Sequence, residues 1–312
     1  MKHNPGQFIS LQTRRNVLKA ALALPVSGIG GRLLAQTERP MLTRAIPHSG
    51  EQLPVVGLGT AVSFPSASQA QRQALEDVIG ALISGGGKLI DTASTYGNAE
   101  EVIGTIVASG QTRDRLFLAT KLEVRPAKAA ADEFQRSLQR LRTEKVDLIQ
   151  LHNVSRPNQS LAQLREWKEA GRCRYVGVTT TFDQDYDAME AIIRHEKPDF
   201  VQVDYSMDNR DAEKRIIPAA AEVGAAVLTA LPLGRTSLFQ AVKGKTFPVW
   251  AKDFDADTWA QFFLKFLLSN PSVTAVIPGT GNAQHMIDNL NAGRGRLPDP
   301  QQREKMLAVL AS

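Results

Sequence analysis

The feature that most constrains this chain is a regular alternation of short hydrophobic runs with segments of helical period. In the first helical segment, five apolar residues between positions 75 and 83 fall on one face of a helix. Eight strand–helix pairs of this kind predict a closed (β/α)8 TIM barrel. The eight strands are expected within residues 53–60, 88–92, 116–121, 146–152, 175–179, 200–205, 226–231 and 273–278.

An open, doubly wound sheet is the alternative fold. That fold would favour a phosphate-binding Gly-x-Gly-x-x-Gly pattern after the first strand, and Gly57-Leu58-Gly59 lacks the third glycine. We therefore expect one barrel domain over residues 36–312. Its strands and helices are preceded by a β-hairpin over residues 43–56 and followed by an extra C-terminal helix over 299–311.

Two further segments of the barrel can be assigned from their patterns. Residues 232–256 contain no clear period and are predicted to form a long loop. The segment that follows repeats aromatic and aliphatic residues at helical spacing, which indicates a core-facing helix rather than a cofactor site. Its apolar positions are Trp259, Phe262, Phe263, Phe266 and Leu267.

The first 35 residues have the order of an export signal. Arg14-Arg15 precedes a short apolar run over residues 20–31, and Leu33-Leu34-Ala35 offers a small residue for cleavage. The paired arginines resemble the twin-arginine signal, which implies export of the folded protein to the periplasm by the twin-arginine machinery. A cytoplasmic location is expected if the signal is not used. The apolar run is too short to span a bilayer, so no stable membrane anchor is expected.

Charge and cysteine content exclude several classes of function. The chain has a formal net charge of +5, and residues 1–35 hold five basic residues and no acid. The remainder therefore has 37 − 5 = 32 basic residues against 32 acidic ones, which gives no reason to expect a nucleic-acid partner. The single cysteine, Cys173, excludes an intrachain disulfide or a cysteine-based metal site. No metal ligand set is predicted.

Polar residues close three consecutive predicted strands. Asp91 ends the second strand with Tyr96 in the following turn, Lys121 ends the third, and His152 ends the fourth. Each has an ordinary structural explanation by itself, such as a solvated lysine or a hydrogen-bonded histidine. In a (β/α)8 barrel, however, the carboxyl ends of the strands meet at one mouth, where catalytic residues gather. We therefore expect these four side chains to form one site.

The chemistry of this group of side chains is coherent. An ammonium beside a tyrosine stabilises the phenolate, and a carboxylate would keep that ammonium charged and in place. A neutral histidine can donate a hydrogen bond to a carbonyl oxygen and orient it. The four residues therefore suit reduction of a carbonyl, with hydride arriving at carbon while Tyr96 protonates oxygen.

Several motifs in this order resemble the aldo-keto reductase family over residues 41–300. The resemblance implies a (β/α)8 fold, reversible NAD(P)(H)-dependent conversion of aldehydes or ketones to alcohols, and a catalytic tetrad of Asp91, Tyr96, Lys121 and His152, with no metal. The motifs are Gly57-Leu58-Gly59-Thr60, Asp91-Thr92-Ala93-Ser94-Thr95-Tyr96-Gly97, Thr120-Lys121, Leu151-His152-Asn153, Gly177-Val178-Thr179-Thr180, Val201-Gln202, Leu231-Pro232-Leu233-Gly234, Ile277-Pro278-Gly279-Thr280 and Asp288-Asn289.

The resemblance also implies a nicotinamide cofactor, with NADP(H) favoured over NAD(H). Departures from the family pattern weaken that preference. Ala230 stands where many members stack an aromatic residue on the nicotinamide, and Gly279 and His285 replace a lysine and an arginine that clamp the 2′-phosphate; Arg294 is a candidate to compensate. The implied cofactor-binding residues are Thr60, Asp91, Thr179, Thr180, Gln202, Leu231, Leu233, Arg235, Gly279, Thr280, His285, Asp288 and Asn289.

Two other functions remain open from the sequence. The chain could be a nicotinamide-binding barrel with little turnover that acts as a sensor or partner subunit. It could also be a barrel lyase that uses Lys121 as a Schiff base. The carbonyl or alcohol substrate is a small molecule whose identity is set by the loops after the strands. Those loops are expected at residues 61–68, 122–130, 153–159 and 206–212.

Overall fold

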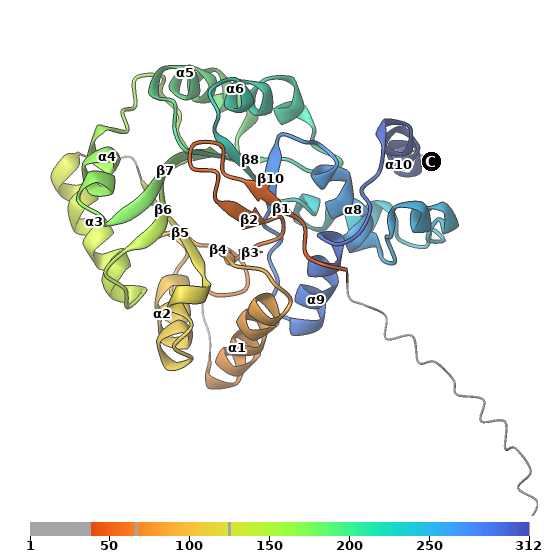
Figure 1. Cartoon of the computed structure of the whole chain (residues 1–312), viewed down its shortest axis with the longest axis horizontal. Coiled ribbons are helices and arrows are strands. Elements are labelled where there is room, and N and C mark those ends of the chain that lie inside the picture. The colour runs from red at the N-terminus through yellow and green to blue at the C-terminus, as the bar shows by residue number, and fades with distance from the viewer. Residues whose placement is uncertain (1–38, 66–67, 124–125, 312) are drawn as a thin grey trace, which may run out of the picture. The chain divides into compact units, whose positions relative to one another are not determined.

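The fold is an eight-stranded parallel barrel, seen end-on in Figure 1 as a ring of strands surrounded by helices. The computed structural model describes residues 39–65, 68–123 and 126–311. Parallel bridges from Val56 to Val276 and from Gly59 to Gly279 close the ring between its first and last strands. The sheet runs in chain order through β3 (Leu58–Gly59), β4 (Leu89–Asp91), β5 (Phe117–Glu123), β6 (Val146–His152), β7 (Cys173–Thr180), β8 (Phe200–Asp204), β9 (Ala226–Ala230) and β10 (Val273–Val276).

Helices alternate with these strands and cover the outside of the barrel (Figure 1). Their first residues follow capping rules: Thr258 accepts from the Gln261 amide before α8, and Asn282 accepts from two amides before α9. The helices are α1 (Gln69–Ser84), α2 (Ala99–Ser109), α3 (Ala127–Arg140), α4 (Ala162–Glu169), α5 (Tyr186–Glu196), α6 (Ile216–Glu222), α7 (Ser237–Ala241), α8 (Trp259–Leu268), α9 (Ala283–Ala292) and α10 (Pro300–Ala311).

This architecture confirms the predicted (β/α)8 class, the N-terminal hairpin and the extra C-terminal helix, and it is incompatible with an open sheet. One prediction was wrong. Residues 232–256 are not an irregular loop, because α7 and two 3-10 helices, Gly234–Thr236 and Val249–Phe254, lie within them. Short helical turns contain too few residues to establish a period, so they could not be predicted from periodicity.

The boundary of one strand also differs from the prediction. Strand β5 continues for two residues past Lys121, so this lysine lies inside the strand and not at its end. This change does not move the side chain of Lys121 to another element.

The interior of the barrel is a packed apolar core and not a channel. Side chains from seven of the barrel strands, β4 to β10, fill it together with Ile277, which follows β10. The hairpin formed by β1 (Thr43–Ala45) and β2 (Gln52–Pro54) closes its amino-terminal end. Ile46 and Leu53 from this hairpin belong to the same cluster and are almost completely buried. The other barrel-core members are Leu89, Phe117, Ala119, Leu148, Tyr175, Phe200, Ala226, Leu228, Ala275 and Ile277.

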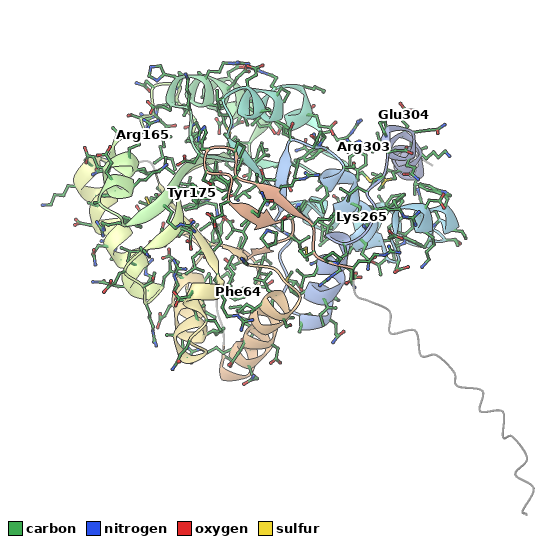
Figure 2. The ribbon with its side chains drawn as sticks, in the orientation of Figure 1. Phe64, Arg165, Tyr175, Lys265, Arg303 and Glu304 are labelled. Atoms are coloured by element: carbon green, nitrogen blue, oxygen red, sulfur yellow. The ribbon has the colours of Figure 1, made fainter. Side chains whose placement is uncertain are left out.

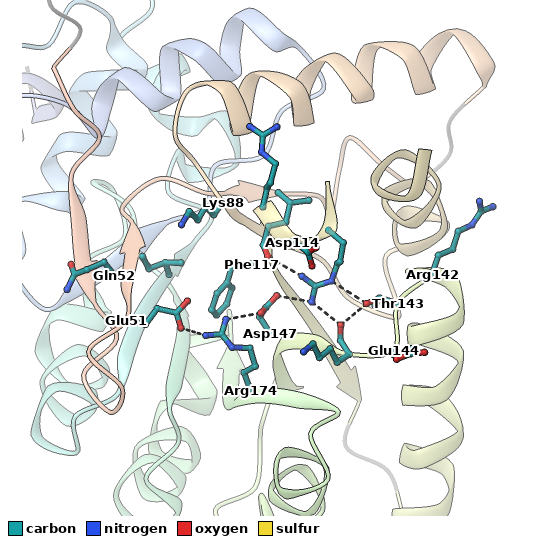
Figure 3. A pocket seen from close by; sticks show the side chains of 15 residues that line it. Glu51, Gln52, Lys88, Asp114, Phe117, Arg142, Thr143, Glu144, Asp147 and Arg174 are labelled. Carbon is teal, nitrogen blue, oxygen red and sulfur yellow. Dashed lines mark hydrogen bonds and ion pairs between the residues drawn. The ribbon is translucent and has the colours of Figure 1, made fainter. Parts of the chain in front are cut away.

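Polar contacts fasten the hairpin to the amino-terminal end of the barrel (Figure 3). Arg174 forms ion pairs with Glu51 of the hairpin and, at 2.9 Å, with Asp147 of β6. The Tyr175 hydroxyl donates to the same Glu51 carboxylate at 2.6 Å. Glu51, Asp147 and Arg174 line a polar cleft of about 640 Å³ at this end of the barrel. Residues at the amino-terminal end of a (β/α)8 barrel usually contribute to stability and not to catalysis.

Two cations labelled in Figure 2 fasten the segments at the carboxyl end of the chain. Arg303 of α10 pairs with Glu213 at 2.5 Å, and its guanidinium lies 4.0 Å from the centroid of the Phe266 ring. Lys265 of α8 is fully buried and donates to the carbonyl oxygens of Arg294 and Arg296. Burial lowers the pKa of Lys265 to about 8, because no carboxylate contacts its ammonium directly.

Candidate active site

A cavity of about 1000 Å³ lies at the carboxyl ends of the barrel strands. It brings together the four predicted catalytic residues and every predicted cofactor residue except Thr180. Its volume is at the upper end of the range for small-molecule and cofactor sites. The residues from the predicted sets that line it are Thr60, Asp91, Tyr96, Lys121, His152, Thr179, Gln202, Leu231, Leu233, Arg235, Gly279, Thr280, His285, Asp288 and Asn289.

A buried ion pair forms the floor of this cavity. Lys121 Nζ lies 2.6 Å from Asp91 Oδ2 and donates to the Thr92 carbonyl oxygen at 2.8 Å, and both charged side chains are at most 4% exposed. Burial raises the pKa of the Asp91 carboxyl, and the attraction of the Lys121 ammonium opposes this shift. The lysine thus has a fixed position and a fixed charge partner.

Tyr96 lies above this pair. The Lys121 ammonium is 5.1 Å from the centroid of the Tyr96 ring, within cation–π range. Gly97 follows with a φ of +52°, and a Cβ at this position would lie 3.0 Å from the Pro65 carbonyl oxygen. The turn that presents Tyr96 to the cavity therefore depends on a glycine at position 97.

His152 completes the group from the neighbouring strand. Its ring meets the Tyr96 ring edge to face, with 5.7 Å between the centroids, and its Nδ1 lies 3.4 Å from the Thr95 hydroxyl. Burial, together with the Lys121 charge, lowers the pKa of His152 to about 4. The imidazole is therefore neutral near pH 7 and can donate only one hydrogen bond.

Amide and hydroxyl groups extend the site across β7 and β8. Gln202 Nε2 donates to Asp91 Oδ2 at 3.2 Å, and the Thr179 hydroxyl accepts from the Asn153 backbone amide. Thr180, predicted to bind cofactor, is fully buried away from the cavity, and its hydroxyl accepts from the Phe182 amide. Side chains of a strand alternate between its two faces, so Thr179 and Thr180 cannot both face the cavity.

The far end of the cavity is poor in positive charge. His285 is exposed there, and the Asp288 carboxylate accepts from Thr258 and Gln261. Arg294, considered above as a compensating cation, instead donates to the Gly85 and Arg39 carbonyl oxygens. Within the described ranges, this end of the cavity therefore has no lysine or arginine for a 2′-phosphate.

Other features of the lining fit a dinucleotide. Arg235 lines the cavity and attracts the Asp204 carboxylate at longer range. Its side chain has no hydrogen bond or ion pair with the described residues, so its guanidinium is available to an anion such as a pyrophosphate. Apolar side chains that the sequence did not assign to the site form much of the wall. These are Val62, Phe182, Phe239 and Trp259, and the first three are exposed.

Asn153 and Gln150 are two further polar residues that sequence reasoning did not assign to the site. Asn153 lines the cavity with a φ of +51°, and its buried Oδ1 has no partner among the described residues. Gln150 lies beneath the cavity and donates to Gln202 Oε1 at 2.9 Å. The only available signal was their position: one follows His152 directly, and the other precedes it by two residues on the inward face of the strand.

A tyrosine, a buried lysine–aspartate pair and a neutral histidine thus lie together at the mouth of a (β/α)8 barrel, beside a cofactor-sized cavity. The sequence pattern of the aldo/keto reductase family matches residues 55–304. The chain belongs to the aldo/keto reductase family, a family of NAD(P)H-dependent oxidoreductases. Within the described part of the chain, no group of three or more His, Cys, Asp or Glu residues is arranged to hold a metal ion.

Relatives with similar sequences carry the same family name. The chain is 29% identical over 192 residues to aldo-keto reductase YhdN of Bacillus subtilis (strain 168), covering 56% of this chain and 57% of the relative. It is 30% identical over 190 residues to an aldo-keto reductase of Mycobacterium avium (strain 104), covering 59% and 64%. The chain thus matches about three fifths of the length of these relatives.

Solved structures agree over a larger part of the chain. A crystal structure of an aldo-keto reductase from Klebsiella pneumoniae in complex with NADPH superimposes with a TM-score of 0.70 at 26% identity, covering 86% of this chain and 94% of that one. Another, from the same organism, contains NADP and acetate and has a TM-score of 0.69 at 26% identity over 84% and 93% of the two chains.

Proposed function

We propose that this protein reduces aldehydes or ketones to alcohols with hydride from a nicotinamide cofactor, and catalyses the reverse oxidation. The observation that carries the proposal is the joining of Tyr96, the Lys121–Asp91 pair and neutral His152 at one end of a cofactor-sized cavity. The substrate is a small carbonyl compound or alcohol. No nucleic-acid partner is proposed.

In this proposal the bound nicotinamide supplies or accepts hydride, and the chain's own residues handle the proton and the substrate oxygen. Tyr96 donates its hydroxyl proton to the carbonyl oxygen as negative charge develops there. The Lys121 ammonium stabilises the tyrosinate that remains, and Asp91 keeps this ammonium in place. The neutral His152 ring donates a hydrogen bond that orients the carbonyl oxygen. The reverse reaction uses the same groups in the opposite order.

We propose NADP(H) as the cofactor, with NAD(H) as a weaker alternative. The Klebsiella relatives were crystallised with NADPH and NADP, which supports this choice. Arg235 would meet the pyrophosphate, Gln202 and Thr179 the carboxamide, and Asp288 and Asn289 the adenine. Thr60, Leu231, Leu233, Gly279, Thr280 and His285 would contribute to the remaining contacts.

The test is turnover of the purified protein. Under the proposal, NADPH is consumed when a panel of aliphatic and aromatic aldehydes is added, and an equal amount of alcohol forms. A panel that gives no alcohol, with a protein that still binds NADPH in a fluorescence titration, would favour the second candidate function. That candidate is a nicotinamide-binding barrel with little turnover, and Ala230 favours it because no aromatic side chain stands there to stack on the nicotinamide.

A lyase that forms a Schiff base on Lys121 fits the site less well. Its nucleophile would have to be a neutral amine, whereas Lys121 donates to a carboxylate and a carbonyl oxygen while almost completely buried. Failure of borohydride to trap substrate on Lys121 would agree with this assessment.

We also propose that residues 1–35 are a twin-arginine signal, that residues 36–312 form one barrel domain, and that the mature protein acts in the periplasm. The support is the order of Arg14-Arg15, apolar run and Ala35 in the sequence; these residues lie outside the described ranges. Among the described helices, none is long and apolar enough to cross a membrane. Cell fractionation of wild type and an Arg14→Lys, Arg15→Lys variant tests export: the variant should remain in the cytoplasm.

A further inference from the structure

A row of buried amides leads from β6 to the catalytic ion pair. Gln150 Nε2 donates to Gln202 Oε1 at 2.9 Å, Gln202 Nε2 donates to Asp91 Oδ2 at 3.2 Å, and Asp91 holds Lys121 at 2.6 Å. Gln150 is fully buried and is absent from the described lining of the cavity. It holds the Gln202 oxygen, and its own side-chain hydrogen bond to Asp91 opposes the rise that burial causes in the pKa of that carboxyl.

The barrel makes room for this contact with a glycine. Gln150 on β6 pairs in register with Gly177 on β7, the strand that separates it from β8 and Gln202. A Cβ on Gly177 would lie 3.1 Å from Gln150 Cγ and 2.8 Å from the Phe200 carbonyl oxygen. Because Gly177 has no side chain, Gln150 can reach across β7 to the next strand.

The donors and acceptors in this row can be arranged in only one way when Asp91 is ionised. A carboxylate only accepts, so Gln202 must present its NH2 group to Asp91 and its oxygen to Gln150. Gln150 must then donate. Replacing Gln150 with a residue that cannot donate would leave the buried Gln202 oxygen without a partner, and the amide could then rotate and withdraw its N–H from Asp91.

We propose that Gln150 is a positioning residue for carbonyl reduction: it fixes the Gln202 amide so that one N–H holds the Asp91 charge while the other faces the cavity. That second N–H is available to a carbonyl oxygen, such as that of a nicotinamide carboxamide. This inference rests on the proposed function, because it assigns Gln150 a role in the same site. It makes Gln202 a donor to the cofactor and not an acceptor.

The test compares Gln150→Met, which keeps the length of the side chain but cannot donate, with Thr229→Val as a matched control. Thr229 is a fully buried polar residue of β9, the strand beside β8. Its hydroxyl has no partner among the described residues, and it is not one of the residues that line the cavity. Both variants should remain folded, and the unfolding temperature of Gln150→Met should be the lower of the two because the Gln202 oxygen loses its donor. Only Gln150→Met should bind NADPH about tenfold more weakly in a fluorescence titration, which is the usual effect of losing one hydrogen bond.

A second readout separates positioning from simple packing. Loss of the N–H at Asp91 destabilises its charged form, so the acid limb of the pH profile of kcat/KM should move upward by about one pH unit. Among the described residues, the charged group that contacts Asp91 is Lys121, and Tyr96 and His152 lie on the other side of this lysine. In the protein without cofactor, an NMR titration of the Asp91 carboxyl should show the same upward shift.

Unchanged NADPH affinity and an unchanged Asp91 titration in a folded Gln150→Met variant would overturn the inference. If that variant does not fold, Gln150→Asn, which keeps the amide but is too short to reach Gln202, carries the same expectations. Absence of turnover in the wild type would contradict the proposed function and not the role of Gln150. NADPH binding and the NMR titration of Asp91 would still test that role.

Discussion

Lys121 Nζ lies 2.6 Å from Asp91 Oδ2, and the two side chains are 1% and 4% exposed. The attraction between such charges is strong only because water is excluded, and each charge would be costly in the barrel without the other. The pair therefore sets both the position of the ammonium beneath Tyr96 and the stability of this end of the barrel.

Replacing Asp91 with asparagine should destabilise the protein by about 3 kcal/mol, because it leaves the Lys121 ammonium buried without a counter-charge. Urea unfolding followed by circular dichroism measures this loss. Asp211→Asn is the control: its pair with Lys214 also has a 2.6 Å separation but is largely exposed, so less than about 1 kcal/mol should be lost. Equal losses in the two variants would contradict the account of a buried pair.

His152 should make the folded state sensitive to acid. Its pKa is lowered to about 4 in the folded protein, below the value of about 6.5 expected for unfolded chains. As the pH falls from 6.5 to 4, the unfolded state therefore binds a proton that the folded state does not, and up to about 3 kcal/mol of stability is lost. His152→Gln should abolish that part of the loss in urea titrations at pH 7, 5.5 and 4.5. If the His152→Gln variant loses stability with falling pH as steeply as wild type, the pKa of His152 is not lowered in the folded protein.

Asp204 should have the opposite effect to His152 on the pH dependence of folding stability. Burial raises its pKa to about 6, with Arg235 opposing and Asp183 adding to the shift. A carboxyl with a raised pKa stabilises the folded state at low pH, and this contribution disappears as the pH rises through 6. Asp204→Asn should therefore stabilise the protein at pH 7.5 by about 1 kcal/mol, after allowance for solvent screening, and by almost nothing at pH 4. Thermal unfolding of both proteins at the two pH values measures this difference.

The charge-poor end of the cavity gives a prediction about cofactor choice. His285→Arg should bind NADPH about 10- to 100-fold more tightly than wild type, since a charge-assisted contact to phosphate contributes about 1.5–3 kcal/mol. NADH has no 2′-phosphate, so its affinity should stay within about twofold. Fluorescence titrations with both cofactors test this, and a parallel gain for NADH would show that position 285 does not meet the 2′-phosphate.

The fold could be predicted from the sequence because each barrel strand is a short apolar run between helices of clear period. The tetrad could be placed because strand ends in such a barrel share one mouth, and the structure does bring Asp91, Tyr96, Lys121 and His152 to one cavity. The extension of β5 past Lys121 was missed, because the two following residues, Leu122 and Glu123, do not distinguish a strand from a loop.

Side-chain contacts between residues far apart in the chain could not be predicted from the sequence. The chain separates Gln150 from Gln202 by 52 residues, and only their places in the barrel show that they meet. Thr180 was assigned to the cofactor by resemblance alone, whereas the alternation of strand β7 turns it away from the cavity. The helical turns within residues 232–256 were missed because they are too short to show a period.

The central claim is that Tyr96 delivers the proton during carbonyl reduction, and Tyr96→Phe tests it most directly. NADPH affinity and the unfolding temperature of this variant should match wild type, because only one hydroxyl is removed from the cavity. Its kcat for aldehyde reduction should fall at least 100-fold, in line with the usual contribution of general acid catalysis. A folded variant that binds NADPH and reduces aldehydes at the wild-type rate would contradict the account.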